Sequence, residues 1–399
     1  MKPITSVALV VFCTCFASVA GGQNQDRLGI TGNRRKAAED TITTVTIITF
    51  DAPNEPYTYP VALNERGQVV VRASSVPSLP DAGDSFLRNP NGTFTYLNYE
   101  SDLGIWATAA TSINERGQIA GYVRQINFSN LCEAIVRQPD GTIDFLMLSG
   151  STSAGATSAI AFPPNAAPCQ EGSNAVAINR RGAITGLLGG PPFLAVLWNA
   201  DNTSEEFNIF PEDGSSPYTQ PLAINESGQI AGFYINATYP QTDFRSFLRE
   251  RDGSIITFTV PDSTVTYAIG VNATGKIAGY YGDAHGTSHG FLRMRDGKIV
   301  QFDVPNSSGT TVTAINDRGQ VVGYYGDANG ASHGFLRERD GSIVQFDVPN
   351  SSSTNPSAMN NKGQITGWYT DANGIHGFLR CGEKGHSLQS NSARERLCQ

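Results

Sequence analysis

The chain has 399 residues, 39% of them hydrophobic and 16% charged, which supplies ample material for a core and excludes a disordered chain. Its formal net charge is −8, and Lys and Arg cluster only in the short run at 34–36, so a nucleic-acid-binding surface is disfavoured. Gly (42 residues) and Pro (21 residues) are frequent, which favours short strands and turns over long helices. We therefore expect an all-β protein.

Residues 1–20 have the layout of a cleavable secretory signal. Lys2 precedes an apolar run from Val7 to Phe16, and residues 18–20 (Ser-Val-Ala) supply the small-x-small ending of a cleavage site. The alternative is a membrane anchor, but the run is shorter than the roughly 20 residues that a spanning helix needs. We expect an exported protein, extracellular or periplasmic, without a membrane span. Residues 21–42 then form a linker or a processed leader.

The rest of the chain is built from a repeat, whose clearest copy is TVTAINDRGQVVGYYGDANGASHGFLRERDGSIVQFDVP at 311–349. Its AIN-x-x-G element recurs in steps of 44 to 65 residues, longer than solenoid repeats of roughly 20 to 34 residues and typical of propeller blades. We expect the asparagine of this element to bond turn amides. The seven asparagines are Asn64, Asn114, Asn179, Asn225, Asn272, Asn316 and Asn360.

Four extended runs within one copy, TVTAI, QVVGYY, HGFLRER and SIVQFDV, predict an antiparallel meander. An Asn-x-x-Gly turn links the first two runs, and an Asp-Gly hairpin such as Asp340-Gly341 links the last two. Small residues such as Gly323 and Gly334 stand where sheets must approach closely. The pattern predicts a seven-bladed β-propeller of four-stranded antiparallel meanders over 43–380, followed by a C-terminal tail at 381–399.

The two ends of the repeat region are complementary. The seventh copy stops at residues 377–380 (GFLR) without its fourth strand, whereas IITFDAPN at 47–54 matches the fourth-strand sequence IVQFDVPN at 299–306. We expect this N-terminal strand to complete the C-terminal blade, so that the ring closes and no long sheet edge stays bare. The alternative is an open superhelix, which would leave the partial copies at both ends unpaired.

The AIN-x-x-G-x-x-x-G element followed by His-Gly-Phe-Leu-Arg resembles the HAF-type extracellular repeat proteins of secreted bacterial products. The similarity spans roughly 43–380 and is strongest from Ala223 onward. The chain departs from the family's His-Ala-Phe in having Gly290, Gly334 and Gly377 at the middle position. The resemblance implies an exported repeat domain and brings no established activity, so no catalytic residue can be carried over.

Four cysteines follow the expected signal: Cys132, Cys169, Cys381 and Cys398. An even number in an exported protein predicts two disulfides. Cys132 and Cys169 fall in loops on the same face of neighbouring blades, and Cys381 and Cys398 bracket the tail, so we predict these two pairs. The spacing of the cysteines is not that of a metal finger, so no zinc site is expected.

Loop length distinguishes the two faces of the predicted ring. The turn face carries the tight turns that link the first to the second strand and the third to the fourth. The loop face carries the second-to-third links and the crossovers between blades, and it collects the insertions at 72–85, 123–132, 147–173 and 235–245. Long irregular loops on a rigid scaffold usually hold binding sites, so we expect the loop face to be the working face.

Three similar loops, GDAHGTSHG, GDANGASHG and TDANGIHG, follow tandem aromatic residues on the loop face. Aromatic rings beside carboxylates form a common sugar-binding combination. The alternative is that each Asp caps its own turn while the aromatic rings fill space between blades. The loops lack the carboxylate density of calcium sites, so neither a metal nor a cofactor is expected. The candidate ligand-binding residues are Tyr281, Asp283, Tyr325, Asp327, Tyr369 and Asp371, together with His285.

His285 is the sharpest enzyme candidate, because the matching positions of the next repeats hold Asn329 and Asn373. A lyase for acidic glycans would use a Tyr or His base, and Tyr281 lies nearby in sequence. The alternative is neutral drift from Asn on an exposed turn. His289, His333 and His376 share one repeat position, for which we expect a structural hydrogen-bonding role.

These patterns favour a secreted, monomeric, non-enzymatic binding or interaction module that recognises carbohydrate or a cell-surface partner through its loop face. The alternative is a glycan-degrading enzyme, a polysaccharide lyase or glycoside hydrolase, on the same face. A third possibility is a scaffold with no small ligand. Nucleophile-elbow, zinc-protease and nucleotide-binding motifs are absent from the sequence, so catalytic residues stay unidentified.

Overall fold

The computed structural model describes residues 45–77, 83–101, 104–125, 131–148, 171–189, 193–210, 218–238 and 241–381. All regular elements in these ranges are β-strands. The described residues contain no helix long and apolar enough to cross a membrane. The predicted signal at 1–20, the linker at 21–42 and the tail beyond Cys381 lie outside them.

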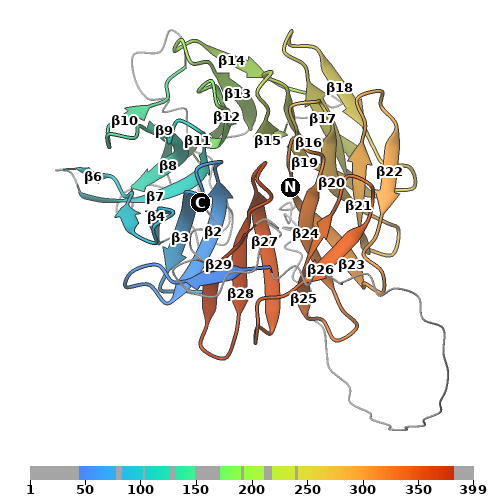
Figure 1. Ribbon diagram of the computed structural model, residues 1–399. Coiled ribbons are helices and arrows are strands. Elements are labelled where there is room, and N and C mark those ends of the chain that lie inside the picture. Colours follow the sequence, from blue (N-terminus) through green and yellow to red (C-terminus); the bar gives the residue numbers. More distant parts are fainter. Residues whose placement is uncertain are drawn as a thin grey trace, which may run out of the picture.

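Antiparallel pairings group the described strands into seven four-stranded meanders, called blades 1 to 7 here, which stand around a ring (Figure 1). Blade 1 comprises β2 (Tyr57–Leu63), β3 (Val69–Ser74), β4 (Asp84–Arg88) and β5 (Phe94–Tyr96). Blade 2 comprises β7 (Gly104–Ile113), β8 (Ile119–Gln125), β9 (Leu131–Arg137) and β10 (Ile143–Phe145). Blade 3 comprises β11 (Glu171–Ile178), β12 (Ile184–Gly189), β13 (Leu194–Trp198) and β14 (Ser204–Phe207). The short β6 (Glu100–Ser101) pairs with β7.

Blade 4 comprises β15 (Thr219–Ile224), β16 (Ile230–Thr238), β17 (Gln241–Arg249) and β18 (Ile255–Phe258). Blade 5 comprises β19 (Val265–Val271), β20 (Ile277–Gly282), β21 (Ser288–Arg293) and β22 (Ile299–Phe302). Blade 6 comprises β23 (Gly309–Ile315), β24 (Val321–Gly326), β25 (Ser332–Arg337) and β26 (Ile343–Phe346). Blade 7 comprises β27 (Ser353–Met359), β28 (Ile365–Thr370), β29 (Ile375–Arg380) and β1 (Ile47–Phe50). The predicted all-β propeller fold of antiparallel meanders is confirmed, and the meanders correspond one to one with the sequence repeats.

The core lies between blades, so the middle strands are apolar on both sides. Val322 and Leu336 of blade 6 pack against Ile365 and Phe378 of blade 7 in one buried cluster. Burial of such side chains contributes about 1.5–3 kcal/mol each, and it requires both neighbours to be present. Consecutive apolar residues in β24 and β25 therefore follow from burial on both faces of the sheet.

Arginine side chains at the ends of third strands also join neighbouring blades. The Arg337 guanidinium lies 4.9 Å from the ring centroid of Phe302 in the preceding blade. Such cation–π contacts contribute about 0.5–2 kcal/mol each. The five pairs of this kind are Arg88–Phe50, Arg249–Phe207, Arg293–Phe258, Arg337–Phe302 and Arg380–Phe346.

The repeated asparagines form a closed ring of hydrogen bonds. The Asn316 Oδ1 accepts from the Gln320 backbone N at 3.0 Å, and its Nδ2 donates to the Asn360 carbonyl of the next blade at 3.2 Å. Asn360 Nδ2 then donates to the Asn64 carbonyl at 3.0 Å, which closes the circle. The remaining members donate in the same way, Asn64 to Asn114, Asn114 to Asn179, Asn179 to Asn225, Asn225 to Asn272, and Asn272 to Asn316.

The chain ends close the ring as the sequence predicted. β1 pairs antiparallel with β29 from Ile47↔Arg380 to Phe50↔Gly377. A Cβ atom on Gly377 would lie 2.5 Å from the Phe50 ring, so β1 can occupy this place only against a glycine. Figure 1 shows the blue strands β2 and β3 beside the red strands β27 and β28, since β29 also pairs with β2.

Deletion of residues 1–51, which removes β1, is expected to lower the melting temperature by roughly 5 °C or more or to produce dimers, because β29 loses its ladder partner and Phe50. Deletion of residues 1–44 is the matched control and leaves β1 in place. Differential scanning fluorimetry and size-exclusion chromatography compare the two. Equal melting temperatures with both forms monomeric would show that β1 does not close the ring.

Candidate functional site

Three neighbouring blades carry the same cluster of side chains on the loop face. In blade 5, the register of β20 and β21 places Tyr281 opposite His289. Their rings stack with centroids 5.1 Å apart and planes at 26°. Tyr281 is only 8% exposed, so this predicted ligand-binding ring lies beneath the histidine and offers little surface to a ligand.

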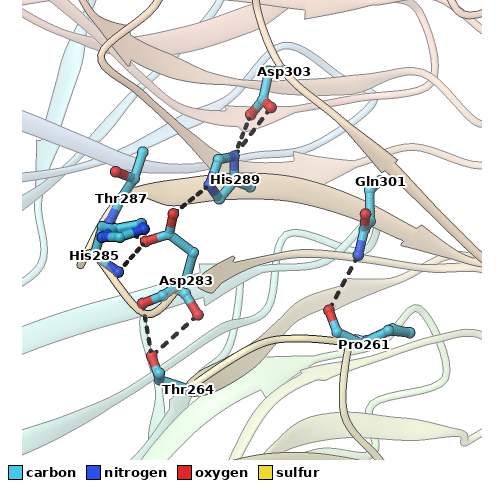
Figure 2. A network of polar contacts seen from close by, with 9 residues as sticks. Pro261, Thr264, Asp283, His285, Thr287, His289, Gln301 and Asp303 are labelled. Atoms are coloured by element: carbon cyan, nitrogen blue, oxygen red, sulfur yellow. Dashed lines mark hydrogen bonds and ion pairs between the residues drawn. The ribbon is translucent and has the colours of Figure 1, made fainter.

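Asp283 caps the loop that follows β20. Its Oδ1 accepts from the backbone N of His285 and of Thr287, both at 2.8 Å. The hydrogen bond from the Thr287 backbone, helped by that from His285, lowers the pKa of Asp283. Thr264 in the preceding crossover donates to the Asp283 carbonyl at 3.1 Å and fixes the loop from below (Figure 2). Asp283 therefore has the turn-capping role that the structural alternative assigned to it.

His289 bridges two carboxylates from different segments. Its Nδ1 lies 3.0 Å from both carboxylate oxygens of Asp303, which follows β22, and its Nε2 lies 3.5 Å from Asp283 Oδ2. Figure 2 shows the imidazole held between the two acids. The Asp303 side chain is 50% exposed, so its oxygens keep lone pairs open to solvent or a ligand.

Blades 6 and 7 repeat this arrangement. His333 Nδ1 lies 2.9 Å from Asp347 Oδ2, and its Nε2 lies 3.6 Å from Asp327 Oδ2. The rings of Tyr325 and His333 are 5.2 Å apart, as are those of Tyr369 and His376. The cluster of each blade thus contains a buried or half-buried Tyr, a His and two Asp.

Blade 7 completes its cluster with the N-terminal strand. His376 Nδ1 lies 2.6 Å from Asp51 Oδ1, and its Nε2 lies 3.2 Å from Asp371 Oδ1. Asp51 directly follows β1, more than 300 residues earlier in the chain than His376. The ring-closing strand therefore contributes a side chain to the candidate site.

In blades 6 and 7 the paired carboxylates shift His333 and His376 toward their charged form. Burial alone would lower the pKa of His376, but hydrogen bonds and attraction from Asp51 and Asp371 outweigh it and raise the pKa above the usual 6.5. The same balance, with Asp347 and Asp327, raises the pKa of His333. Protonated imidazole in this position bonds both acids at once.

His285 does not join this cluster through its ring. It is exposed at the tip of the loop, and its backbone N is the group that bonds Asp283, while Tyr281 packs on His289 instead. The described residues contain no group of three or more His, Cys, Asp or Glu side chains arranged to hold a metal ion. The geometry thus gives no support to a catalytic pair of His285 and Tyr281.

The first residue of each aromatic tandem lies in a different environment from the second. Tyr280 contacts Tyr267 with centroids 5.1 Å apart, and Tyr267 contacts Phe233 of blade 4 at the same distance. Burial, with repulsion from Tyr267 and Tyr324, raises the pKa of Tyr280 to about 12. Trp368 lies 6.0 Å from Tyr59 of blade 1. Neighbouring side chains of a strand point to opposite faces of the sheet. This alternation could have shown from the sequence that the two aromatic residues of each tandem lie in different environments.

Two of the four predicted disulfide cysteines lie in the described residues. Cys132 in β9 and Cys381 after β29 are both disulfide-bonded. Their predicted partners, Cys169 and Cys398, lie outside the described residues, so the pairs 132–169 and 381–398 stay predictions.

Comparison with known proteins supports the fold and leaves the ligand open. No protein-family model matches the chain, and no curated protein matches it, so the HAF-type resemblance stays a prediction. Virginiamycin B lyase from Staphylococcus aureus is similar in structure, with 13% identity, a TM-score of 0.52, and coverage of 84% of this chain and 99% of that one. This match shows a shared β-propeller fold.

Two further solved structures are more distant. A puromycin hydrolase matches 81% of this chain and 52% of its own, with 12% identity and a TM-score of 0.48. Aleuria aurantia lectin matches 86% of this chain and 96% of its own, with 12% identity and a TM-score of 0.40. Likeness at this level carries no argument about function.

The raised pKa of His376 predicts a pH-dependent stability. A raised histidine pKa contributes stability that is fully present below about pH 6.5 and is lost as the pH rises through the folded value. The wild type should therefore melt at a lower temperature at about pH 8.5 than at about pH 6, and His376→Gln should reduce this difference. His285→Gln, on the exposed turn, is the control and should leave the difference unchanged. If His376→Gln shows an equally large difference in melting temperature between the two pH values, protonation of His376 does not cause the pH dependence of stability.

Proposed function

We propose that the protein is a non-enzymatic carbohydrate-binding module that binds through three equivalent clusters on the loop face of blades 5 to 7. The observation that carries this proposal is the repetition of one Tyr–His–Asp–Asp arrangement in three adjacent blades. An enzyme needs one convergent and unique set of ionisable groups, whereas a multivalent binder repeats a similar set. The clusters fit the second description.

The outer aspartates supply the groups that a sugar would contact. Asp303, Asp347 and Asp51 have side chains that are 50%, 46% and 59% exposed. Each is oriented by a histidine, so its carboxylate is held in place before a ligand arrives. Carboxylate oxygens accept hydrogen bonds from sugar hydroxyls, and charge-assisted bonds of this type are the stronger ones. The binding residues are thus the exposed acids, with Tyr281, Tyr325 and Tyr369 supporting the histidines.

The charge of these clusters favours a neutral sugar over an acidic one. Each histidine lies between two carboxylates, so a cluster keeps a net negative charge even when its imidazole is protonated. Arg245 on β17 of blade 4 is paired with Asp243 at 2.6 Å. A uronate polymer would be repelled here, which weighs against a lyase for acidic glycans. The expected export signal places such a module outside the cytoplasm, where glycans of cell surfaces are accessible.

A glycan array tests the proposal directly. The wild type should bind neutral glycans, and Asp303→Asn/Asp347→Asn should weaken the apparent affinity by about tenfold or more, because two of three equivalent sites are lost. Asp262→Asn is the matched control. Asp262 lies in the same kind of crossover with φ of 62°, and the next repeats hold Asn306 and Asn350 there with φ of 64° and 65°, so the change is tolerated without strain.

Failure of the wild type to bind any neutral glycan, or equal binding by the double variant, would overturn the proposal. The enzyme alternative is tested in the same samples by following reducing ends and unsaturated products. Their appearance with wild type, and their loss in the double variant, would assign catalysis to the loop face instead.

A further inference from the structure

A second candidate site lies on the opposite, turn face, between blades 5 and 6. The strands there leave a groove of about 620 Å³ between the first turn of blade 5 and both turns of blade 6. Three basic side chains line it, together with two acidic and several neutral polar residues. The basic residues are Lys276, Arg318 and Arg339, and the acidic ones are Asp317 and Glu338.

The two acids are engaged in the fold. Asp317 Oδ1 accepts from the Ala273 backbone N at 2.7 Å, and its Oδ2 accepts from Asn361 Nδ2 at 2.8 Å. The Glu338 carboxylate accepts from Gln320 Nε2 at 3.1 and 2.9 Å. Amide donors rather than the basic side chains thus orient both carboxylates.

The three cations line the groove, and none of them forms an ion pair with another described residue. The ion pairs found among the described residues involve Arg245, Arg249 and the three cluster histidines, and none includes Lys276, Arg318 or Arg339. Lys276 Nζ reaches across from blade 5 to within 3.8 Å of the Cβ position of Gly319 in blade 6. Gly319 has φ of 82°, so the turn itself favours glycine and no side chain fills that space.

The groove between blades 3 and 4 is a second hollow on the turn face. It is smaller, about 370 Å³, and contains Arg181, Arg249 and Arg251. There Arg249 NH2 is paired with Glu205 Oε1 at 2.6 Å, so one of its three cations already has a carboxylate partner in the protein. The groove between blades 5 and 6 is larger and its cations are unpaired, which leaves room for a carboxylate-like group from a ligand.

Basic residues recur around the whole turn face. One set follows the ring asparagines by two positions, and another precedes the Asp-Gly hairpins. The first set is Arg66, Arg116, Arg181, Arg318 and Lys362, and the second is Arg251, Arg295 and Arg339. Acidic residues stand beside most of them, such as Glu65, Glu115 and the aspartates of the Asp-Gly hairpins. The groove between blades 5 and 6 gathers three cations in one hollow, so it is the part of this face that suits an anionic group.

We propose that the groove between blades 5 and 6 is a binding site for an anionic polysaccharide, whose carboxylate or sulfate groups contact Lys276, Arg318 and Arg339. Asp317 and Glu338 between the cations suit a ligand that also carries hydroxyl donors, as a sugar chain does. A nucleic acid backbone lacks such donors along its phosphates, so it fits less well. This site is separate from the loop-face clusters and takes the opposite class of glycan.

The test uses the full chain and surface plasmon resonance on immobilised heparin, polygalacturonate, dextran and duplex DNA. We expect binding to heparin or polygalacturonate that weakens with salt, whereas any binding to dextran should be unchanged in the groove variant described next. Lys276→Ala/Arg318→Ala/Arg339→Ala should lose about tenfold or more in affinity, because three charge-assisted contacts are removed. Preference for heparin identifies sulfate as the recognised group, and preference for polygalacturonate identifies carboxylate.

Arg295→Ala is the matched control, since Arg295 occupies in blade 5 the turn position of Arg339 but does not line the groove. It should bind within about twofold of wild type. The loop-face variant Asp303→Asn/Asp347→Asn should also bind the anionic polymer normally. The proposal for this groove and the proposal for the loop face are therefore tested independently. Unchanged binding by the triple variant, no binding of either acidic polysaccharide, or tighter binding of DNA than of both would overturn the proposal.

Discussion

The rest of the structure depends on the ring of buried asparagine amides. Each asparagine bonds its own turn through Oδ1 and the next blade through Nδ2, so one side chain joins the local turn to the neighbouring blade. A buried amide whose partner is missing costs about 1–3 kcal/mol of folding free energy. In the closed ring every asparagine has a partner in the next blade, so the loss of any blade would leave one amide unsatisfied. The last bond, from Asn360 to Asn64, therefore requires all blades to be in place at once.

Closure by β1 couples the fold to the candidate site. The strand brings Phe50 over Gly377 and beneath Arg88, and it ends at Asp51, which bonds His376. In blades 5 and 6 the equivalent acid is on the same continuous meander as its histidine, whereas in blade 7 it arrives from the other end of the chain. The third cluster therefore exists only in a closed ring, and its carboxylate–imidazole bond adds to the closure.

Much of the fold was predictable because the repeat is local and regular. Asn-x-x-Gly turns, Asp-Gly hairpins and the orphan fourth strand at 47–54 identify the meanders and the place where the chain ends meet. The sites were less predictable, because they depend on which way a strand side chain points. Tyr281 looked like a ligand platform in sequence, but the register of β20 and β21 places His289 over it. The partner of that histidine, Asp303, lies in a different strand segment and gave no local signal.

The two candidate sites coexist because they lie at opposite ends of the same strands. A six-residue strand spans roughly 20 Å, whereas charges in physiological salt are screened over about 8 Å. The acids that follow β22 and β26 therefore do not neutralise the cations at the asparagine turns. Within one repeat, the loop-face end carries Asp and His, whereas the turn-face end carries Arg or Lys beside the Asp of the Asp-Gly hairpin. Copying the unit around a ring gives a loop face with repeated carboxylate–imidazole clusters and a turn face with mixed charges, and these two faces can recognise different ligands.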